Sequence, residues 1–372
     1  MTIREIETDH RRDVRRFVDF PFTLYENCPQ WSPPLVSSVK LALNRSKHPF
    51  YSHSDAAFFL TEAEGDVVGR IAVLDNRRYN EYTGRSAAFF YYFDVVNNEH
   101  VARALFEAAA EWAAARGLKV LLGPKGLLRS DPLGILIEGF EHVAALSMPY
   151  NFPYYPKLIE AAGFEKDMDY ISGYMNPEQK LPARMHELAG RVKERRGFWV
   201  KSFDTKRELR EWIPEIQRVN NEAFTDVWGY YPIDDAEVQM IGDQLLTIAD
   251  PRLIKLVMQD DEIAGFAFVF PDVTRALQAT RGRIWPFGWI RLLIAMRRTD
   301  RLCGNGIGLL PKYQGLGASM LLYLELAKTV RERGASYCEI AQVMETNVKS
   351  LGDMNRVGVT WHKRHRLYRR SL

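Results

Sequence analysis

The chain has 372 residues, 26% of which are charged, and its formal net charge is +3. This length exceeds what one hydrophobic core usually supports, so two domains are expected. Acidic and basic residues nearly balance, which argues against a nucleic-acid partner, because such a protein usually carries a strong positive field.

The N-terminal residues MTIREIETDH lack the apolar core of a secretory signal, so a cytoplasmic location is expected. No apolar run approaches the roughly 18 residues that a membrane-spanning helix needs. The three cysteines, Cys28, Cys303 and Cys338, are not spaced like a zinc site or a disulfide framework. They are predicted to be free thiols, and no metal is expected.

The first half of the chain is predicted to be a mixed α/β domain. Apolar alternation predicts strands at 2–7, 56–61, 67–74, 87–96 and 120–122, and helical spacing predicts helices at 11–24, 33–41 and 101–116. The turn Glu64-Gly65-Asp66 predicts a hairpin. Asn97 or Asn98 can cap the last of these helices.

The second half repeats this order. Strands are predicted at 198–203, 253–258, 263–270 and 337–343, with one more ending at 307–310, and helices at 207–224, 235–248 and 316–333. When the halves are aligned, Gly69 matches Gly265 and Gly163 matches Gly358. The shared order of elements predicts a tandem duplication.

A polar segment bracketed by prolines, 176–182, is the predicted linker, so the domains are expected at 1–176 and 177–372. An insertion in the second half, 283–298, places tryptophans, a phenylalanine and aliphatic residues between arginines. Its composition suits either an interfacial helix in peripheral contact with a membrane or a lid packed on the domain. Basic residues near the C-terminus are expected on a solvated face, namely Lys363, Arg364, Arg366, Arg369 and Arg370.

The segment 306–334 carries the most specific signal. An apolar strand runs into Pro311, and Gln314, Gly315 and Gly317 follow before a long amphipathic helix. Glycines at this turn let backbone N–H groups approach an anion, and the helix N-terminus adds partial positive charge. The turn is therefore predicted to bind a diphosphate.

This loop and the elements around it resemble the GNAT acyltransferase superfamily, and the resemblance covers most of the chain as two copies. The superfamily's loop has Gln or Arg, two residues, Gly, one residue, then Gly or Ala; here Gln314, Gly317 and Ser319 stand at those positions. The resemblance implies two tandem α/β folds with mixed sheets and an acyl-CoA co-substrate, with acetyl-CoA as the default donor. It implies a CoA site made of Leu309, Leu310, Lys312, Gln314, Gly315, Leu316, Gly317, Ala318, Ser319 and Asn347.

The first copy lacks this loop. Its equivalent segment, 89–105, has neither the Gln or Arg nor a glycine at the strand-to-helix turn. An anion there would meet side chains before it met backbone amides. Residues 1–176 are therefore expected to be a degenerate copy that serves as a scaffold or shapes the acceptor pocket.

Acylation of an amine requires a neutral nitrogen, so a proton acceptor is expected near the thioester. Glu339 is the leading candidate because it interrupts an apolar strand, with ion pairing on the sheet face as the alternative and Glu345 as a second choice. Met354 stands where the superfamily has a proton-donating tyrosine, and methionine cannot donate a proton. Tyrosines that could substitute, or could simply pack, are Tyr323, Tyr337 and Tyr368.

The acceptor site of the superfamily lies over the loop between the first two helices, which is 221–235 in the second copy. Trp228, Tyr230 and Tyr231 are predicted to form an aromatic wall for the substrate, or alternatively a loop cluster that covers the core. Nearby carboxylates that could attract an amine are Asp226, Asp234 and Asp235.

Together these features predict an acyl-CoA-dependent N-acyltransferase that acts on a small amine or amino-acid-like acceptor. Two alternatives stay open. Met354 and the degenerate first copy would suit a non-catalytic, CoA-responsive regulatory protein. The apolar insertion at 284–296 would suit a long-chain N-acyl amino acid synthase that uses acyl-carrier protein. The sequence does not indicate an oligomeric state.

Overall fold

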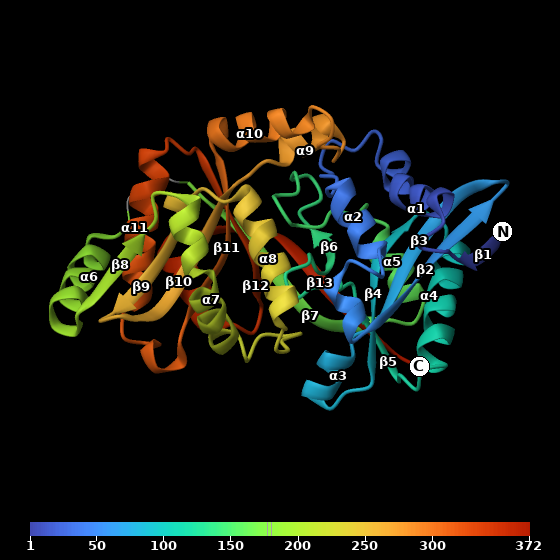
Figure 1. Ribbon diagram of the computed structural model, residues 1–372, viewed down its shortest axis with the longest axis horizontal. Helices are drawn as coiled ribbons and strands as arrows, with labels where there is room; N and C mark the ends of the chain where they lie inside the picture. The colour runs from blue at the N-terminus through green and yellow to red at the C-terminus, as the bar shows by residue number, and fades with distance from the viewer. Residues whose placement is uncertain (177, 180) are drawn as a thin grey trace. The chain divides into compact units, whose positions relative to one another are not determined.

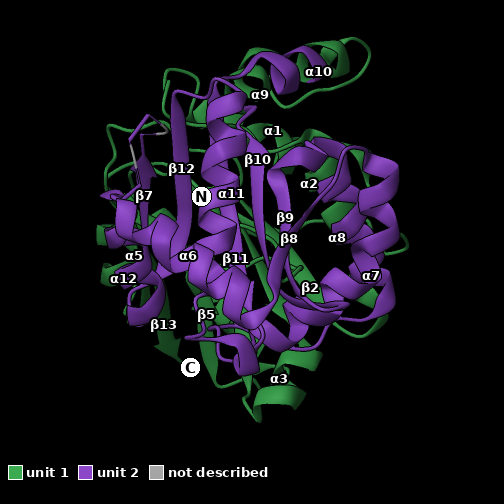
Figure 2. Cartoon of the chain, turned by 90° about the vertical axis from the view of Figure 1, so that its left-hand side faces the viewer, with its two compact units in different colours: residues 1–170, 274–292, 363–372 green, residues 171–273, 293–362 purple. Residues whose placement is uncertain are grey.

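The computed structural model describes residues 1–176, 178–179 and 181–372, and the chain divides into two compact units. The first unit contains residues 1–170, 274–292 and 363–372, and the second contains residues 171–273 and 293–362 (Figure 2). Each unit therefore combines segments that are far apart in the sequence, unlike the predicted single boundary after residue 176. Residues 177 and 180 of the predicted linker, the first of which is the predicted start of the second domain, lie outside the described residues.

Both units mix helices and strands, so the mixed α/β class is confirmed (Figure 1). The first unit contains β1 (Thr2–Glu5), α1 (Arg11–Leu24), α2 (Val36–Leu43), η1 (Pro49–Ser52), β2 (Asp55–Ala63), β3 (Asp66–Asp75), α3 (Arg77–Thr83), β4 (Ala87–Val95), α4 (Glu99–Ala114), β5 (Val120–Gly123), β6 (Ile135–Glu138), α5 (Tyr155–Ala161) and α9 (Thr274–Thr280). The second contains α6 (Ala183–Arg196), β8 (Phe198–Ser202), α7 (Lys206–Ala223), α8 (Asp235–Ile248), η2 (Pro251–Leu253), β9 (Ile254–Gln259), β10 (Glu262–Pro271), β11 (Arg301–Leu309), η3 (Pro311–Tyr313), α11 (Ala318–Glu332), β12 (Tyr337–Met344) and α12 (Val348–Arg356). Three elements have residues in both units: β7 (Glu165–Met175), α10 (Gly288–Arg298) and β13 (Thr360–Ser371).

The first unit holds a mixed sheet in the order β1-β2-β3-β4-β5-β13, with β6 against β13. Strands β4 and β5 run parallel, and the other pairs in this order run antiparallel. Because side chains alternate along a strand, Ile71 and Val73 of β3 enter an apolar core with α4. Arg70 points to the opposite face, where it donates to the Phe17 carbonyl oxygen of α1 at 2.6 Å. Helices α4 and α1 therefore cover opposite faces of β3.

The second unit holds a sheet in the order β8-β9-β10-β11-β12, in which only the last pair is parallel. On one face, Ala189 of α6 and Leu322 of α11 pack with Val257 of β9. On the other face, Phe224 at the end of α7 packs edge-on against Phe266 of β10, with ring centres 5.7 Å apart. The sheet is thus covered on both sides, as its apolar strands require.

The two units repeat the same internal geometry. The parallel pairing begins at Ala87 in β4 and at Arg301 in β11. Tyr92 and Gly306 lie equally far along the sequence from these two starting residues, and both have positive φ angles, 46° and 147°. Near each of them the register shifts, in the pairing of β4 with β3 and of β11 with β10. Both irregularities are β-bulges, so the duplication predicted from the order of elements extends to the details of the strands.

The glycine matches also hold. Gly69 and Gly265 occupy corresponding places in the ladders of β3 with β4 and of β10 with β11. Gly163 and Gly358 both precede the last strand of a repeat, with φ angles of 85° and 84°. A left-handed residue is needed at each of these turns, and glycine adopts that conformation without strain.

The C-terminal basic residues do not form a free solvated face, and that expectation was wrong. They belong to β13, whose residues 363–371 lie in the first unit and pair with β5 and β6. Lys363 is buried, Arg366 donates to Asp169 at 2.8 Å, and Arg370 donates to Glu107 at 2.9 Å. These arginines have specific acidic partners, which the sequence pattern did not reveal.

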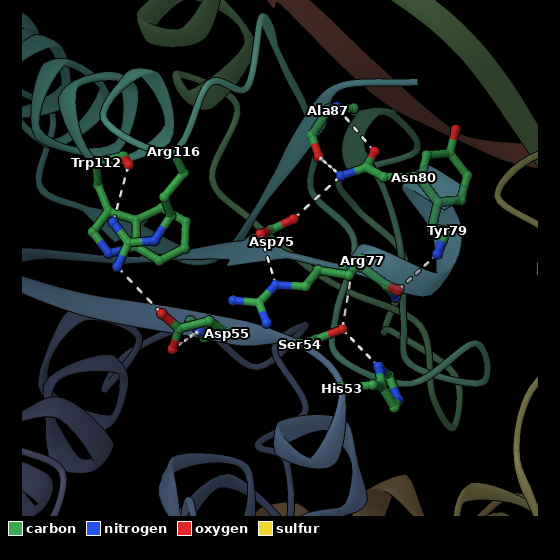
Figure 3. Close-up of polar contacts among 12 residues, drawn as sticks. His53, Ser54, Asp55, Asp75, Arg77, Tyr79, Asn80, Ala87, Trp112 and Arg116 are labelled. Carbon is green, nitrogen blue, oxygen red and sulfur yellow. Dashed lines mark hydrogen bonds and ion pairs between the residues drawn. The ribbon is translucent and has the colours of Figure 1, made fainter. Parts of the chain in front are cut away.

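A side-chain clamp fixes the start of β4 in the first unit (Figure 3). Asn80 of α3 donates through Nδ2 to the Ala87 carbonyl oxygen at 2.9 Å and accepts through Oδ1 from the Ala87 N–H at 3.0 Å. The same Nδ2 donates to Asp75 at 3.2 Å. The parallel pairing with β5 begins at Ala87, so the clamp holds the residue at which that pair starts.

We expect Asn80→Ala to lower the free energy of unfolding by about 1–3 kcal/mol, because two backbone groups of buried Ala87 lose their partner. Arg77→Ala is the matched control on the same helix. It removes an ion pair with Asp75 at 3.4 Å whose arginine side chain is 59% exposed, so its cost should stay within about 1 kcal/mol. Urea titrations measure both, and equal costs would contradict the role of the clamp.

Candidate active site

The parallel strands of the second unit part along their length. Strands β11 and β12 pair from Arg301 opposite Tyr337 as far as Gly304 opposite Ile340, although both continue beyond that point. Gln342 of β12 has a φ angle of 43°, and its N–H donates to the Ser172 hydroxyl of β7 at 2.9 Å. Within the described residues, the β12-facing edge of β11 therefore has no strand partner from residue 305 onward.

The predicted phosphate loop follows this edge directly. Gly315 and Gly317 have φ angles of 73° and 86°, and α11 begins at Ala318. A Cβ on Gly317 would lie 2.7 Å from Val192, whereas one on Gly315 would meet nothing within 4 Å. Gln314 and Gly315 are exposed. The loop thus offers an open helix N-terminus, whose first amides have no acceptor within the helix and can bind a phosphate.

Two predicted loop side chains already have protein partners. The Lys312 ammonium lies 2.7 Å from the Glu262 carboxylate. Gln314 donates to the Leu309 carbonyl oxygen at 3.3 Å and accepts from the Lys349 ammonium at 3.4 Å. Lys349 was not among the residues predicted for this site. Its contact with Gln314 shows that its charge lies beside the loop.

The remaining residues predicted for the CoA site have varied surroundings. Leu310 is buried, and its N–H donates to the Ala264 carbonyl oxygen at 2.9 Å. Ala318 is buried in the core, and those that are half-buried are Leu309, Leu316, Gly317 and Ser319. Asn347 caps α12, since its Oδ1 accepts from the Ser350 N–H at 3.0 Å.

Glu339 is fully buried, and its polar partners include a histidine and a tyrosine. Its Oε1 lies 3.0 Å from Nε2 of His362, and its Oε2 accepts a hydrogen bond from the Tyr337 hydroxyl. Cys338 and Ile340 pack on the face that α11 covers, so Glu339 between them points to the other face. The carboxylate is therefore held by a tyrosine and a histidine inside the second unit.

Aromatic rings surround this carboxylate. Tyr174 stacks on Tyr337 with ring centres 5.4 Å apart and lies the same distance from the ring of His362. Arg301 places its guanidinium 3.8 Å from the Tyr337 ring centre. Burial and the neighbouring Glu339 raise the pKa of Tyr337 above its ordinary value, so this hydroxyl remains a proton donor at neutral pH.

The Glu339–His362 pair contains the two groups that commonly act together as a general base. An imidazole that is hydrogen-bonded to a carboxylate can take up a proton and pass it on. His362 was not predicted, because it lies just before the residues that were interpreted as a basic cluster, Lys363 to Arg370. The alternation of apolar and polar residues there would have indicated a strand. It would not have shown which carboxylate contacts His362.

The other candidates for proton donation lie elsewhere. Met354 is buried in an apolar cluster, and Tyr323 packs against the same cluster. Burial raises the pKa of Tyr323. Tyr368 belongs to the first unit, where its hydroxyl donates to Glu160 at 3.1 Å. Of the three tyrosines, Tyr337 is therefore the one whose hydroxyl bonds to Glu339.

The aromatic loop between α7 and α8 is mostly buried. Tyr230 and Tyr231 are 8% and 2% exposed, and the Tyr231 hydroxyl donates to Glu237 at 3.5 Å. Trp228 is half-buried. The burial of the two tyrosines fits a cluster that covers the core, and the aromatic wall for a substrate stays a prediction.

The corresponding point of the first unit is closed. Counted from the start of each parallel pair, Lys125 corresponds to Gln342. The N–H of Lys125 donates to the Phe90 carbonyl oxygen of β4 at 2.9 Å, so the chain after β5 stays bonded to β4 where β12 leaves β11. The strand edge that has no strand partner in the second unit is therefore hydrogen-bonded at the corresponding point of the first unit. This agrees with a degenerate first copy.

Lys125 is itself buried. Its ammonium donates to the carbonyl oxygens of Leu128 and Arg129 at 2.8 and 2.9 Å. Burial lowers the pKa of Lys125 to about 8, despite the opposing attraction of Asp131. The closed segment thus carries a cation that is costly to keep charged.

Two curated proteins align along nearly the whole of this chain. No protein-family model matches the chain. Protein YghO of Escherichia coli (strain K12) is 26% identical and covers 98% of this chain and 94% of its own length. The bacterial ceramide synthase of Caulobacter vibrioides (strain NA1000 / CB15N) is 27% identical and covers 97% and 95%.

Solved structures share the fold. A tandem GNAT protein from the clavulanic acid biosynthesis pathway matches 100% of this chain and 98% of its own, with a TM-score of 0.55 and 12% identity. A GCN5-related N-acetyltransferase from Sphaerobacter thermophilus matches 100% and 95%, with a TM-score of 0.50 and 14% identity. The predicted tandem GNAT fold is confirmed.

No helix among the described residues is long and apolar enough to cross a membrane.

Lys125 should make stability rise with pH. Its pKa is about 8 in the folded protein, against about 10.4 for an unperturbed lysine, so between these values the unfolded chain binds more protons. Lys125→Met should lose this slope. The difference in free energy of unfolding between the two proteins should change by about 2 kcal/mol from pH 7.5 to 10. Guanidinium titrations across this range give the slopes, and parallel slopes would contradict the assignment.

Proposed function

Because this chain is a tandem protein of the GNAT fold, we propose that its second unit is an acyl-CoA-dependent N-acyltransferase. The observation that carries the proposal is the parting of β11 from β12 directly before an open glycine loop. The amides of a pantetheine arm can bond to the free edge of β11 as a strand would. The diphosphate can then reach the first amides of α11, between Gly315 and Ser319.

The proposed reaction joins an amine nitrogen to the thioester carbonyl carbon and breaks the carbon–sulfur bond. The amine proton passes to the Glu339–His362 pair, directly or through a water, and the thiolate leaves with a proton from that pair or from solvent. Glu339 is fully buried, so His362 is the member that exchanges protons with a substrate. Tyr337 is a positioning residue, because its hydroxyl donates to one oxygen of Glu339 and leaves the other to His362.

For the substrates, we propose a long-chain amine as acceptor and a long-chain acyl-CoA as donor. The support is the relative called a bacterial ceramide synthase, which aligns along nearly the whole of both chains. A ceramide is the amide of a fatty acid with a long-chain amino alcohol. Acetyl-CoA with a small amine, and acyl-carrier protein as donor, are the alternatives. A diphosphate-binding loop favours CoA over acyl-carrier protein, whose prosthetic group carries a single phosphate.

A panel of substrates separates these possibilities. The full-length protein is incubated with acetyl-CoA or palmitoyl-CoA, and with sphinganine, small amines or amino acids. Free thiol is measured as it is released, and the amide is identified by mass spectrometry. Palmitoyl transfer to sphinganine would support the proposed substrates. CoA binding without thiol release for any pair would overturn catalysis in favour of a regulatory protein.

We expect Gly315→Glu to weaken CoA binding by at least about 100-fold, because a carboxylate would stand where the diphosphate binds. Gly334→Glu, at the other end of α11, is a closely matched control. Both glycines are exposed, have φ angles of 73° and 70°, and would place a Cβ in open space. The strain in the two variants should therefore be similar. Calorimetric titration with CoA measures binding, and equal affinities of the two variants would refute the loop assignment.

Glu339→Gln and His362→Gln should each lower kcat/KM by about 100-fold to 10,000-fold at pH 7, because the amine loses its proton acceptor. The deficit should shrink towards pH 10, where more of the amine is already neutral. Tyr337→Phe keeps the acceptor pair and should cost much less. Thiol release across this pH range tests the pair, and full activity of either Gln variant at pH 7 would exclude that residue. Thermal melting of each variant shows whether it is folded.

A further inference from the structure

Six exposed apolar side chains gather in one short segment that includes α10, which is labelled in Figure 1. We call them the apolar face; with exposed fractions from 41% to 84%, they are Trp285, Phe287, Trp289, Ile290, Leu293 and Ile294. Scattered apolar residues on a surface are ordinary, but a contiguous group that includes two tryptophans marks a binding surface.

The helix itself has an inward side and an apolar outward side. Leu292 and Met296 are buried and share one side of α10. The four apolar-face residues of the helix occupy the adjoining exposed side, as follows from the helical turn of about 100° per residue. Arg291 and Arg298 lie along the border of that side. A helix that met only water would place polar residues where α10 has tryptophan, leucine and isoleucine.

The segment that leads into α10 is anchored in the first unit. Gln278 of α9 donates to the carbonyl oxygens of Pro29 and Trp31 at 2.8 and 2.9 Å. Arg283 pairs with Asp19 at 2.9 Å. The apolar face is therefore presented from an ordered base, which reduces the ordering cost of binding.

The segment that carries the apolar face is itself basic. The chain has no acidic residue between Asp272 and Asp300, and that interval contains the arginines 275, 281, 283, 291, 297 and 298. Arg291, Arg297 and Arg298 of α10 are exposed and form no ion pair with any described residue. A second copy of the chain seated symmetrically on this face would bring like charges together, whereas an anionic surface would neutralise them.

We propose that α10 and the turn before it bind the surface of an anionic lipid bilayer. The apolar face enters the boundary between headgroups and acyl chains, where tryptophan is favoured, and the arginines contact lipid phosphates. An 11-residue helix is only about 16 Å long, roughly half the thickness of the hydrocarbon core, so α10 lies in the interface and does not span it. Vesicle binding requires no substrate, so this proposal is independent of the transfer reaction.

The test is flotation of the full-length protein with vesicles of phosphatidylcholine, with and without phosphatidylglycerol. The wild type should bind the anionic vesicles, and high salt should weaken the binding. Trp289→Asp combined with Leu293→Asp should reduce binding at least about tenfold. Replacing Arg291, Arg297 and Arg298 by Gln should reduce binding to anionic vesicles roughly fivefold per arginine. Tyr82→Asp, which changes a 51% exposed aromatic of α3, should bind like the wild type.

Three results would overturn the proposal. The wild type fails to float with anionic vesicles, or the double Asp variant floats as well as the wild type. The third result has two parts: light scattering shows that the wild type is a dimer and the double Asp variant a monomer, and neither protein binds vesicles. That result would assign the apolar face to contact with a second copy of the chain. If the double variant does not fold in a thermal melt, Trp285→Ser with Phe287→Ser tests the same surface outside the helix.

Discussion

The candidate site depends on the backbone hydrogen bonds that β11 and β12 stop making after Gly304. A strand edge inside a sheet is normally paired, because unpaired N–H and C=O groups are costly to bury. Here the edge ends at a glycine loop and a helix N-terminus, which add more amides without acceptors. A ligand with amide groups and a diphosphate can satisfy all of these groups at once, and pantetheine with its nucleotide is such a ligand.

The duplication explains how one sheet design gives an open site and a closed one. Both repeats have a parallel pair of strands followed by a bulge, at Tyr92 and at Gly306. The difference is the direction of one N–H group. Lys125 donates across to Phe90 of β4, whereas Gln342 turns to Ser172 of β7. The first unit therefore keeps the fold but not the open strand edge on which the proposed thioester site depends.

Local patterns in the sequence were sufficient for many elements. Helical spacing of apolar residues predicted α1 with its observed bounds, and Asn98, one of the two asparagines predicted as caps, caps α4 through its side chain. Gly315 and Gly317 were singled out because glycine lets backbone N–H groups approach an anion, and both have positive φ angles. These features depend on residues near one another in the chain, so the sequence carries their signal directly.

Features that depend on distant partners were missed. The strand β13 is rich in arginine and lysine, and its burial makes sense only with acidic partners from remote segments, such as Asp169. Glu339 was selected because it interrupts an apolar strand, but its contact with His362 links different strands. No spacing rule connects residues that meet only when the sheet forms.

The division of β13 has a practical consequence for handling the protein. Its last residues complete the sheet of the first unit: Ser371 pairs with Val120, and the Leu372 N–H donates to the Lys119 carbonyl oxygen at 2.9 Å. A chain cut before residue 363 would expose the edge of β5, a surface prone to aggregation. The first repeat expressed alone would lack this strand.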